Sequence, residues 1–303
     1  GSRERLATIL VAPFMSCTAR IPVYVLLTIL LFPGSPTKQT LAFAGCYLLG
    51  IGAGLFSAMV ARRTLLRGAA RPMAIELPPY RLPSLRTAVL TTWDRGLVFL
   101  RKAGTVIFAI SVVLWWMSTY PVAEPPAEAV ALAERAAALE AQAPEEATAL
   151  HAEAEHITAA ARARGSALGR MGAVMEPVFR PLGYDRQLTV GVLASFAARE
   201  VFVATMAVQV LGVEADDVED QGMLDELAVA QRSDGSGPIF TTATSWSLLV
   251  YYVLAMQCLP TLAVTAREAG HWKWAALQFA WMSGMAWVAA TIVYQALMLA
   301  GVH

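Results

Sequence analysis

Charged residues are scarce in this sequence, and the two signs cancel. Only 15% of its 303 residues are charged, with 23 Lys and Arg against 23 Asp and Glu. A typical soluble domain carries about 25% charged residues. Domains that bind nucleic acid concentrate positive charge, so a net charge of zero gives no support for a nucleic-acid partner.

Cysteine and the common catalytic motifs are equally scarce. Cys17, Cys46 and Cys258 lie far apart and no C-x-x-C pair occurs, which argues against a zinc ribbon or a disulfide framework. The phosphate-binding patterns G-x-x-x-x-G-K-S/T and G-x-G-x-x-G are absent, as is the G-x-S-x-G of serine hydrolases. We therefore assign no nucleotide or GTP site to this chain, and we expect it not to be an enzyme.

Apolar sequence is what the chain has in excess. Hydrophobic residues make up 57% of it and its mean hydropathy is +0.53, whereas soluble domains are about 45–50% apolar. The long uncharged runs predict an all-α, polytopic transmembrane helix bundle of about six spans. A short piece at 173–184, broken by two prolines, is predicted to be re-entrant or interfacial. The predicted spans are 6–32, 40–61, 103–118, 188–211, 245–264 and 272–299.

Arginine in one loop predicts the orientation. Residues 62–86 carry six arginines against a single acid, Glu76, and short loops this rich in Arg stay in the cytoplasm. The first span then runs outward and the second returns. With six spans, the acid-rich loop 213–237 is cytoplasmic and the turn that contains Arg267 and Lys273 lies outside, where its positive charge fits the rule poorly.

Composition divides the chain into three parts. Residues 1–120 form a first membrane segment that includes the Arg-rich loop, and residues 173–303 form a second. Residues 121–172 between them are rich in Ala and Glu. Two polar helices, 127–142 and 145–164, are predicted to pair there as a hairpin outside the membrane.

Two stretches with the pattern S-x-x-A-R place arginine inside membrane-length apolar runs. One runs from Ser16 to Arg20 and the other from Ser195 to Arg199. A charge at such depth costs at least about 2.5–3.5 kcal/mol, so it normally faces a cavity, a partner or a pathway. Paired, interrupted segments in the two halves of a chain indicate a transporter binding site. The alternative is two unrelated arginines whose side chains reach out to the membrane interface.

Prolines near these stretches predict unwound backbone, at Pro13 and Pro22 in the first and at Pro260 in the segment MQCLPT. Thiol, carboxylate and hydroxyl groups beside such backbone can replace the hydration shell of an intermediate cation such as Fe²⁺. For the thiols, the alternative is that a buried cysteine acts only as a small hydrophobe. The candidate metal ligands are Cys17, Cys258, Glu200 and Ser16. The candidate residues of the transport path or gate are Arg20, Arg199, Ser195 and Thr261.

Five segments carry a resemblance to one family. They are PFMSCTARIPVY, IELPPYR, FLRKAGTVI, SFAAREVFVATM and MQCLPTLAV, in this order. Together they resemble the membrane region of FeoB, the bacterial ferrous-iron transporter family. The resemblance implies that the two S-x-x-A-R stretches are the family's Gate segments. It also implies that Cys17 and Cys258 match positions proposed to line the metal path, and that Glu200 matches the Gate acid. Residues 121–172 are poorly covered by it.

The resemblance implies a wider setting as well. Family members are multi-pass proteins of the bacterial inner membrane, and an N-terminal GTP-binding domain drives their uptake of Fe²⁺. The sequence contains no such domain, so the chain resembles a C-terminal permease fragment with Fe²⁺ as its transported substrate. The implied partners are Fe²⁺, the lipid bilayer, the GTP-binding domain of the same protein, small accessory Feo proteins and further copies of the chain.

Two other functions stay open at this point. A nucleoside or organic-solute carrier also uses Gate-type segments, by the same resemblance. A non-transporting membrane scaffold would pair the side chains of Arg20, Arg199 and Glu200 only with one another, and these side chains would line no cavity.

Overall fold

A computed structural model describes residues 2–15, 17–64, 84–122, 124–140, 143–196, 199, 201–207, 227–232, 235 and 237–302. These residues fold almost entirely into helices, and the β-structure among them is one isolated bridge, between Gln231 and Pro238. The predicted all-α class is therefore confirmed. The IELPPYR segment and most of the acid-rich loop lie outside the described residues.

The first apolar segment is interrupted between its two prolines, as predicted. Pro13 and Pro22 each lie at the start of a helical element, where a missing N–H is tolerated because no intrahelical partner exists for it. The segment therefore divides into short pieces instead of forming one straight helix. The N-terminal elements are α1 (Ser2–Val11), the 3₁₀ turns η1 (Ala12–Phe14) and η2 (Thr18–Arg20), α2 (Ile21–Leu31) and α3 (Pro36–Arg63).

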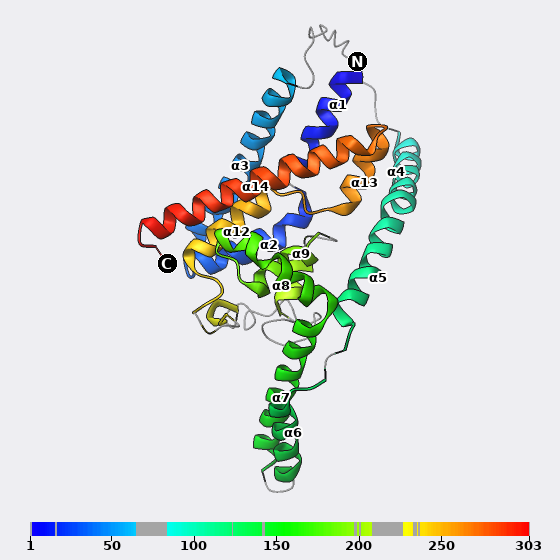
Figure 1. The fold of residues 1–303 in the computed structure, drawn as a ribbon. Coiled ribbons are helices and arrows are strands. Elements are labelled where there is room, and N and C mark those ends of the chain that lie inside the picture. Colours follow the sequence, from blue (N-terminus) through cyan, green and yellow to red (C-terminus); the bar gives the residue numbers. More distant parts are fainter. Residues whose placement is uncertain are drawn as a thin grey trace.

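The middle of the chain forms one long helix and a hairpin. Its elements are α4 (Leu85–Phe99), the π-helical turn η3 (Leu100–Gly104), α5 (Thr105–Thr119), α6 (Ala127–Leu139) and α7 (Pro144–Gly165). Because α4, η3 and α5 follow one another directly, the span predicted at 103–118 continues a helix that begins at Leu85. Helices α6 and α7 lie side by side and project from the rest of the protein, at the end away from the N-terminus (Figure 1). The predicted hairpin is confirmed, and its place outside the membrane stays a prediction.

Short, capped helices open the second half. Its elements are α8 (Ala167–Phe179), the 3₁₀ turn η4 (Arg180–Leu182), α9 (Arg186–Ala194), α10 (Val201–Met206), α12 (Thr242–Leu254), α13 (Leu259–Glu268) and α14 (Trp272–Leu299). Ser166 Oγ accepts the N–H of Gly169 at 3.1 Å, so α8 begins before the predicted piece at 173–184. Asp185 Oδ1 caps α9 in the same way, at 2.9 Å from the N–H of Leu188. Burial raises the pKa of the Asp185 carboxyl, against the smaller lowering effect of that bond.

Four helical segments among the described residues are long and apolar enough to cross a membrane. They are Arg5–Leu31, Pro36–Arg63, Thr242–Glu268 and Trp272–Leu299, and α5 is a shorter apolar helix. The third is the centre of the bundle, because 67% of its apolar window is buried, against 17–41% for the others. Its first part, α12, packs against α14, α2 and α3. These helices support the predicted transmembrane character.

One ion pair corrects the predicted topology. Arg5 Nη2 lies 2.6 Å from Glu268 Oε2. Arg5 lies near the start of the first apolar segment and Glu268 ends α13, so both lie at the same end of the bundle. Figure 1 shows the end of α3 there as well, beside the N-terminus. The prediction that the turn with Arg267 lies on the side opposite Arg5 is wrong. The corrected arrangement gathers this turn and Arg62 on one side, which the positive-inside rule favours.

The second S-x-x-A-R stretch does not form a spanning helix. The nine residues of α9 extend about 13 Å, less than half of a hydrocarbon core of about 30 Å. Helix α10 packs back on α9, and a Cβ on Gly191 would lie 2.9 Å from the Phe202 ring. Beyond both ends of the stretch, Arg232 Nη2 donates to the carbonyl of Gly183 at 3.3 Å. The chain therefore enters and leaves on the same side.

This re-entrant path corrects two predictions. The predicted span at 188–211 is wrong, because α10 folds back on α9 and brings Phe202 and Met206 against Gly191. The described end of the acid-rich loop also departs from the predicted topology. The described end of that loop, at Arg232, lies next to the start of α12, and α12 and α13 then lead away from it to Glu268 and Arg5 (Figure 1).

The corrected topology predicts which positions share a membrane face. In full-length protein whose native cysteines are replaced, Glu268→Cys and Arg62→Cys should react with a membrane-impermeant maleimide from one face. Glu134→Cys in α6 should react from the other. All three side chains are exposed, so burial does not limit the reaction. Labelling of intact and of permeabilised cells measures this. Reaction of Glu268→Cys from the same face as Glu134→Cys would contradict the arrangement.

Candidate functional site

Three interruptions in apolar segments meet beside the end of α12. The first separates η1 from η2, the second separates α9 from α10, and the third separates α12 from α13. The N–H of Leu259 donates to the carbonyl of Phe196 at 3.1 Å, which joins the second interruption to the third. Arg20 follows the first interruption, and its side chain reaches the end of α12 at Val253. In the folded chain, the segments that contain these prolines or the S-x-x-A-R pattern thus lie next to one another.

Arg20 is buried, at 1% exposed, and binds backbone on two sides. Its Nη1 donates to the carbonyl of Val253 at 3.0 Å, and its Nη2 donates to the carbonyl of Pro13 at 3.0 Å. Val253 lies in the last turn of α12, and Pro13 lies in η1 of the arginine's own segment. The guanidinium therefore fastens the first S-x-x-A-R stretch to the end of α12.

Arg199 makes the corresponding bonds from the second stretch. It is 4% exposed. Its Nη1 donates to the carbonyl of Tyr252 at 2.9 Å and its Nη2 donates to the carbonyl of Ala255 at 2.7 Å. Arg20 directly precedes α2, and Arg199 lies two residues before α10. The likeness in sequence is thus matched by a likeness in position and in bonding partner.

The last carbonyls of α12 need such donors. The final four C=O groups of an α-helix have no intrahelical partner, and leaving them unpaired in an apolar interior is costly. Charged donors form the stronger hydrogen bonds, and a cation at a helix C-terminus interacts favourably with the helix dipole. The alternative in which the two arginines reach out to the membrane interface is therefore wrong. Their partners are main-chain carbonyls.

Both candidate cysteines lie in the interruptions themselves. Cys17 precedes η2 and is exposed, whereas Cys258 precedes α13 and is partly buried, and each has an extended backbone. Both lie within electrostatic range of the Arg199 guanidinium, as does Arg20. These four predicted residues are thus brought together. Cys46 is buried in α3 and packs in the hydrophobic core.

The two predicted hydroxyl residues hold local structure. Ser195 is fully buried, and its Oγ donates to the carbonyl of Val192 at 2.6 Å, so it closes the end of α9. Thr261 is half-buried in the first turn of α13, where its N–H donates to the carbonyl of Cys258 at 3.1 Å. Both hydrogen bonds are local, and neither places the residue in a cavity.

Two candidate ligands, Ser16 and Glu200, lie outside the described residues, so their roles stay predictions. Among the residues that the structure does describe, no group of three or more His, Cys, Asp or Glu side chains could hold a metal ion. A cation at this place would therefore have to draw on main-chain or amide oxygens in addition to the thiols.

Two family models match parts of this chain. A family model described as "Ferrous iron transport protein B C terminus" matches residues 43–95. The Gate model, described as "Nucleoside recognition", matches residues 100–272, which is more than half of the chain. The chain belongs to the FeoB family. The Gate match includes the second S-x-x-A-R stretch and the MQCLPT segment, and it begins after the first stretch.

FeoB relatives extend the match over nearly the whole chain. The chain is 31% identical over 295 residues to the "Fe(2+) transport protein A/Fe(2+) transporter FeoB fusion protein" of Porphyromonas gingivalis. It is 33% identical over 297 residues to "Fe(2+) transporter FeoB" of Leptospira biflexa, and 30% over 296 residues to that of Staphylococcus aureus. These alignments cover 96–97% of the chain and 35–39% of the relatives, so the chain spans little more than a third of their length. No solved structure matches it significantly.

Two residues at this FeoB site were not selected from the sequence. Gln257 and Tyr252 flank the interruption after α12, and both side chains are fully buried. Gln257 directly precedes Cys258, and a glutamine inside a membrane-length apolar run is a usable signal. Tyr252 gave none, because tyrosine is common in apolar helices and only the fold places it beside Ser195.

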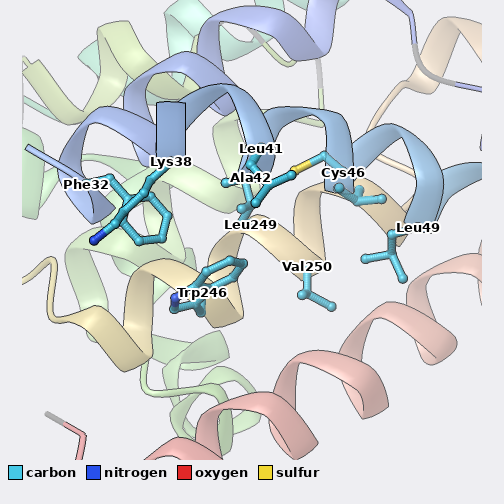
Figure 2. A pocket seen from close by; sticks show the side chains of 11 residues that line it. Phe32, Lys38, Leu41, Ala42, Cys46, Leu49, Trp246, Leu249 and Val250 are labelled. Atoms are coloured by element: carbon cyan, nitrogen blue, oxygen red, sulfur yellow. The ribbon is translucent and has the colours of Figure 1, made fainter. Parts of the chain in front are cut away.

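A groove between α3 and α12 has a different character (Figure 2). Its volume is about 480 Å³, and Lys38 is the charged side chain that lines it. Trp246 and Val250 of α12 face Leu41 and Ala42 of α3 across it. An apolar lining offers few ligands to a cation, and none of the six predicted path residues that the structure describes belongs to this groove.

The bonds of Arg199 predict a measurable contribution to stability. Arg199→Met leaves the carbonyls of Tyr252 and Ala255 without their charged donors. A buried polar group that loses its partner costs about 1–3 kcal/mol. The melting temperature of the purified protein in detergent should fall by about 2–4 °C for each kcal/mol lost. Arg86→Met, on the exposed face of α4, is the matched control and should leave the melting temperature unchanged. An equal or higher melting temperature for Arg199→Met would show that the bonds do not stabilise the fold.

Proposed function

We propose that this chain forms the membrane permease part of a ferrous-iron (Fe²⁺) uptake transporter in the bacterial inner membrane. Fe²⁺ is the transported substrate, and Cys17, Cys258, Glu200 and Ser16 line its path at the interrupted helices. The observation that supports this most is the meeting of three interruptions, from distant parts of the chain, beside two thiols. The names of the FeoB relatives supply the substrate.

Interrupted helices leave backbone carbonyls free to bind a cation, whereas an intact helix uses them in its own hydrogen bonds. Backbone freed from helical bonds is tolerated in a membrane only where it is buried in protein or lines a cavity, and there its carbonyls can act as ligands. Thiolates prefer softer metals and carbonyl oxygens prefer harder ones, so a mixed set suits Fe²⁺. Cys17 is exposed and Cys258 is partly buried, so the two thiols offer successive positions along a path. Transport also requires ligands that release the ion.

The two arginines set the electrostatic condition for such a path. Free guanidinium groups beside the thiols would repel a cation. Here Arg20 and Arg199 bind carbonyls at the negative end of the α12 dipole, which offsets part of their charge. A cation that passes them needs further negative charge, and Glu200 is the residue that we propose for it.

The intact protein supplies the rest of the machinery in this proposal. The chain spans 35–39% of its relatives' length, which leaves room for an N-terminal GTP-binding domain that drives transport. We assign no catalytic activity to the chain itself. The fusion of Fe(2+) transport protein A to FeoB in the Porphyromonas relative supports a small accessory Feo protein as a partner. Residues 1–120 and 173–303 are the two membrane segments, and 121–172 form the hairpin outside the bilayer.

One alternative has a specific observation in its favour. The Gate model carries the description "Nucleoside recognition", so a nucleoside carrier remains the second candidate. Nucleosides that displace Fe²⁺ from the purified protein would favour it. The scaffold hypothesis required the arginines to pair only with Glu200 and with each other, and the bonds from Arg20 and Arg199 to carbonyls do not match it.

The thiols carry the sharpest prediction of this function. In the full-length protein, Cys17→Ser combined with Cys258→Ser should lower Fe²⁺ uptake by about tenfold or more, as loss of metal contacts commonly does. Uptake of radioactive iron by cells under reducing conditions measures it, with membrane abundance checked by immunoblot. Cys46→Ser is the control, because Cys46 is buried in the hydrophobic core and is not a proposed ligand. Unchanged uptake in the double variant would remove the thiols from the path.

A further inference from the structure

Polar atoms without partners gather beside the end of α12. Gln257 is 0% exposed, yet neither its Oε1 nor its Nε2 has a hydrogen-bond partner among the described residues. The hydroxyl of Tyr252 lies beside the side chains of Ser195 and Gln257, and it too makes no hydrogen bond of good geometry among the described residues. Arg20 Nε is a fourth such atom. Buried polar groups are nearly always paired, so a cluster of exceptions marks a place that water or a ligand completes.

We propose that the C-terminal end of α12 is an oxygen-lined site for a partly dehydrated divalent cation. Its ligands are the carbonyls of Tyr252, Val253 and Ala255 together with the Gln257 amide oxygen, which the Tyr252 hydroxyl orients from beside it. Arg20 and Arg199 occupy the carbonyls in the conformation described here. The inference rests on the proposed function as a cation permease. It adds to the thiols a set of oxygen ligands and a mechanism of occlusion.

The ligand chemistry follows from the break in the helix. Carbonyls at the C-terminal end of an interrupted membrane helix carry the negative end of the helix dipole, and such ends coordinate cations in transporters. Amide and carbonyl oxygens suit a harder ion than thiolates do, so Cys258 beside them completes a mixed set for an intermediate ion. Gln257 directly precedes Cys258, and both residues lie in the break between α12 and α13.

The arginines explain how such a site could be closed. A guanidinium group and a cation cannot share one carbonyl oxygen, because both are positive. The cation can therefore enter only after Arg20 or Arg199 leaves. The two guanidiniums lie within electrostatic range of each other, so departure of either relieves a repulsion. Because each arginine precedes a short helix, movement of α2 or α10 would carry it away from the carbonyls.

The test measures Fe²⁺ binding to purified full-length protein by equilibrium dialysis without oxygen. Gln257→Leu and Tyr252→Phe, which remove the side-chain oxygens, should each weaken binding by about tenfold. Gln257→Glu adds a carboxylate and should tighten binding, a gain that misfolding cannot produce. Tyr251→Phe is the matched control, because Tyr251 is the neighbouring buried tyrosine, its ring packs against Phe179 and Tyr184 as well as Tyr252, and its hydroxyl is not a proposed ligand.

A second pair of variants tests the occlusion. Arg20→Gln and Arg199→Gln free carbonyls and remove a competing charge, so each should tighten Fe²⁺ binding relative to the unmodified protein. Equal or weaker binding in both, with the helical circular dichroism retained, would overturn the role of the arginines as occupants.

The outcomes separate this inference from the proposed function. If Gln257→Leu binds Fe²⁺ like the unmodified protein and Gln257→Glu brings no gain, the cluster holds only water and the oxygen site is wrong. The permease would still stand if Cys17→Ser with Cys258→Ser abolishes uptake in the same preparations. If the unmodified protein itself neither binds nor transports Fe²⁺, the proposed function fails instead.

Discussion

The capping of one helix end by two arginines is the constraint on which the rest of this bundle depends. Helix α12 ends at Leu254 in the interior, where its last carbonyls cannot reach water. Arg20 and Arg199 supply the donors from opposite halves of the chain. Two otherwise costly features, buried charge and unpaired backbone, therefore offset each other. Because three segments must meet for this to happen, the capping also fixes how the two halves pack.

The same contacts are the reason for placing the proposed function at the breaks and not in the apolar groove. In an intact membrane helix the carbonyls accept intrahelical hydrogen bonds, whereas at an interruption they can bind neighbouring groups. Around the end of α12 those groups meet two thiols and a fully buried glutamine. The apolar groove between α3 and α12 has no comparable set of ligands. The candidate site is identified by its ligand groups and not by the volume of a cavity.

Much of the local structure could be read from the sequence. Pro13, Pro22 and Pro260 marked the interruptions because a residue without an N–H cannot continue a helix, and the Ala- and Glu-rich segment marked the hairpin. The topology was misread at residues 188–211, since apolar length alone does not distinguish a span from two short helices folded back on each other. Gly191 permits that close return, and its effect depends on Phe202, which lies eleven residues further along the chain.

The sequence by itself determined the membrane class, the helical fold, the family resemblance and the residues that deserved attention. Apolar composition and proline affect the chain locally, so membrane segments and helix interruptions can be predicted from the sequence without coordinates. Only the tertiary structure decided the partners of those residues. The bonds from Arg20 to Val253 and from Arg199 to Ala255 join positions far apart in the chain. No local pattern encodes them, because they arise from how the interrupted helices satisfy one another's backbone in an interior without water.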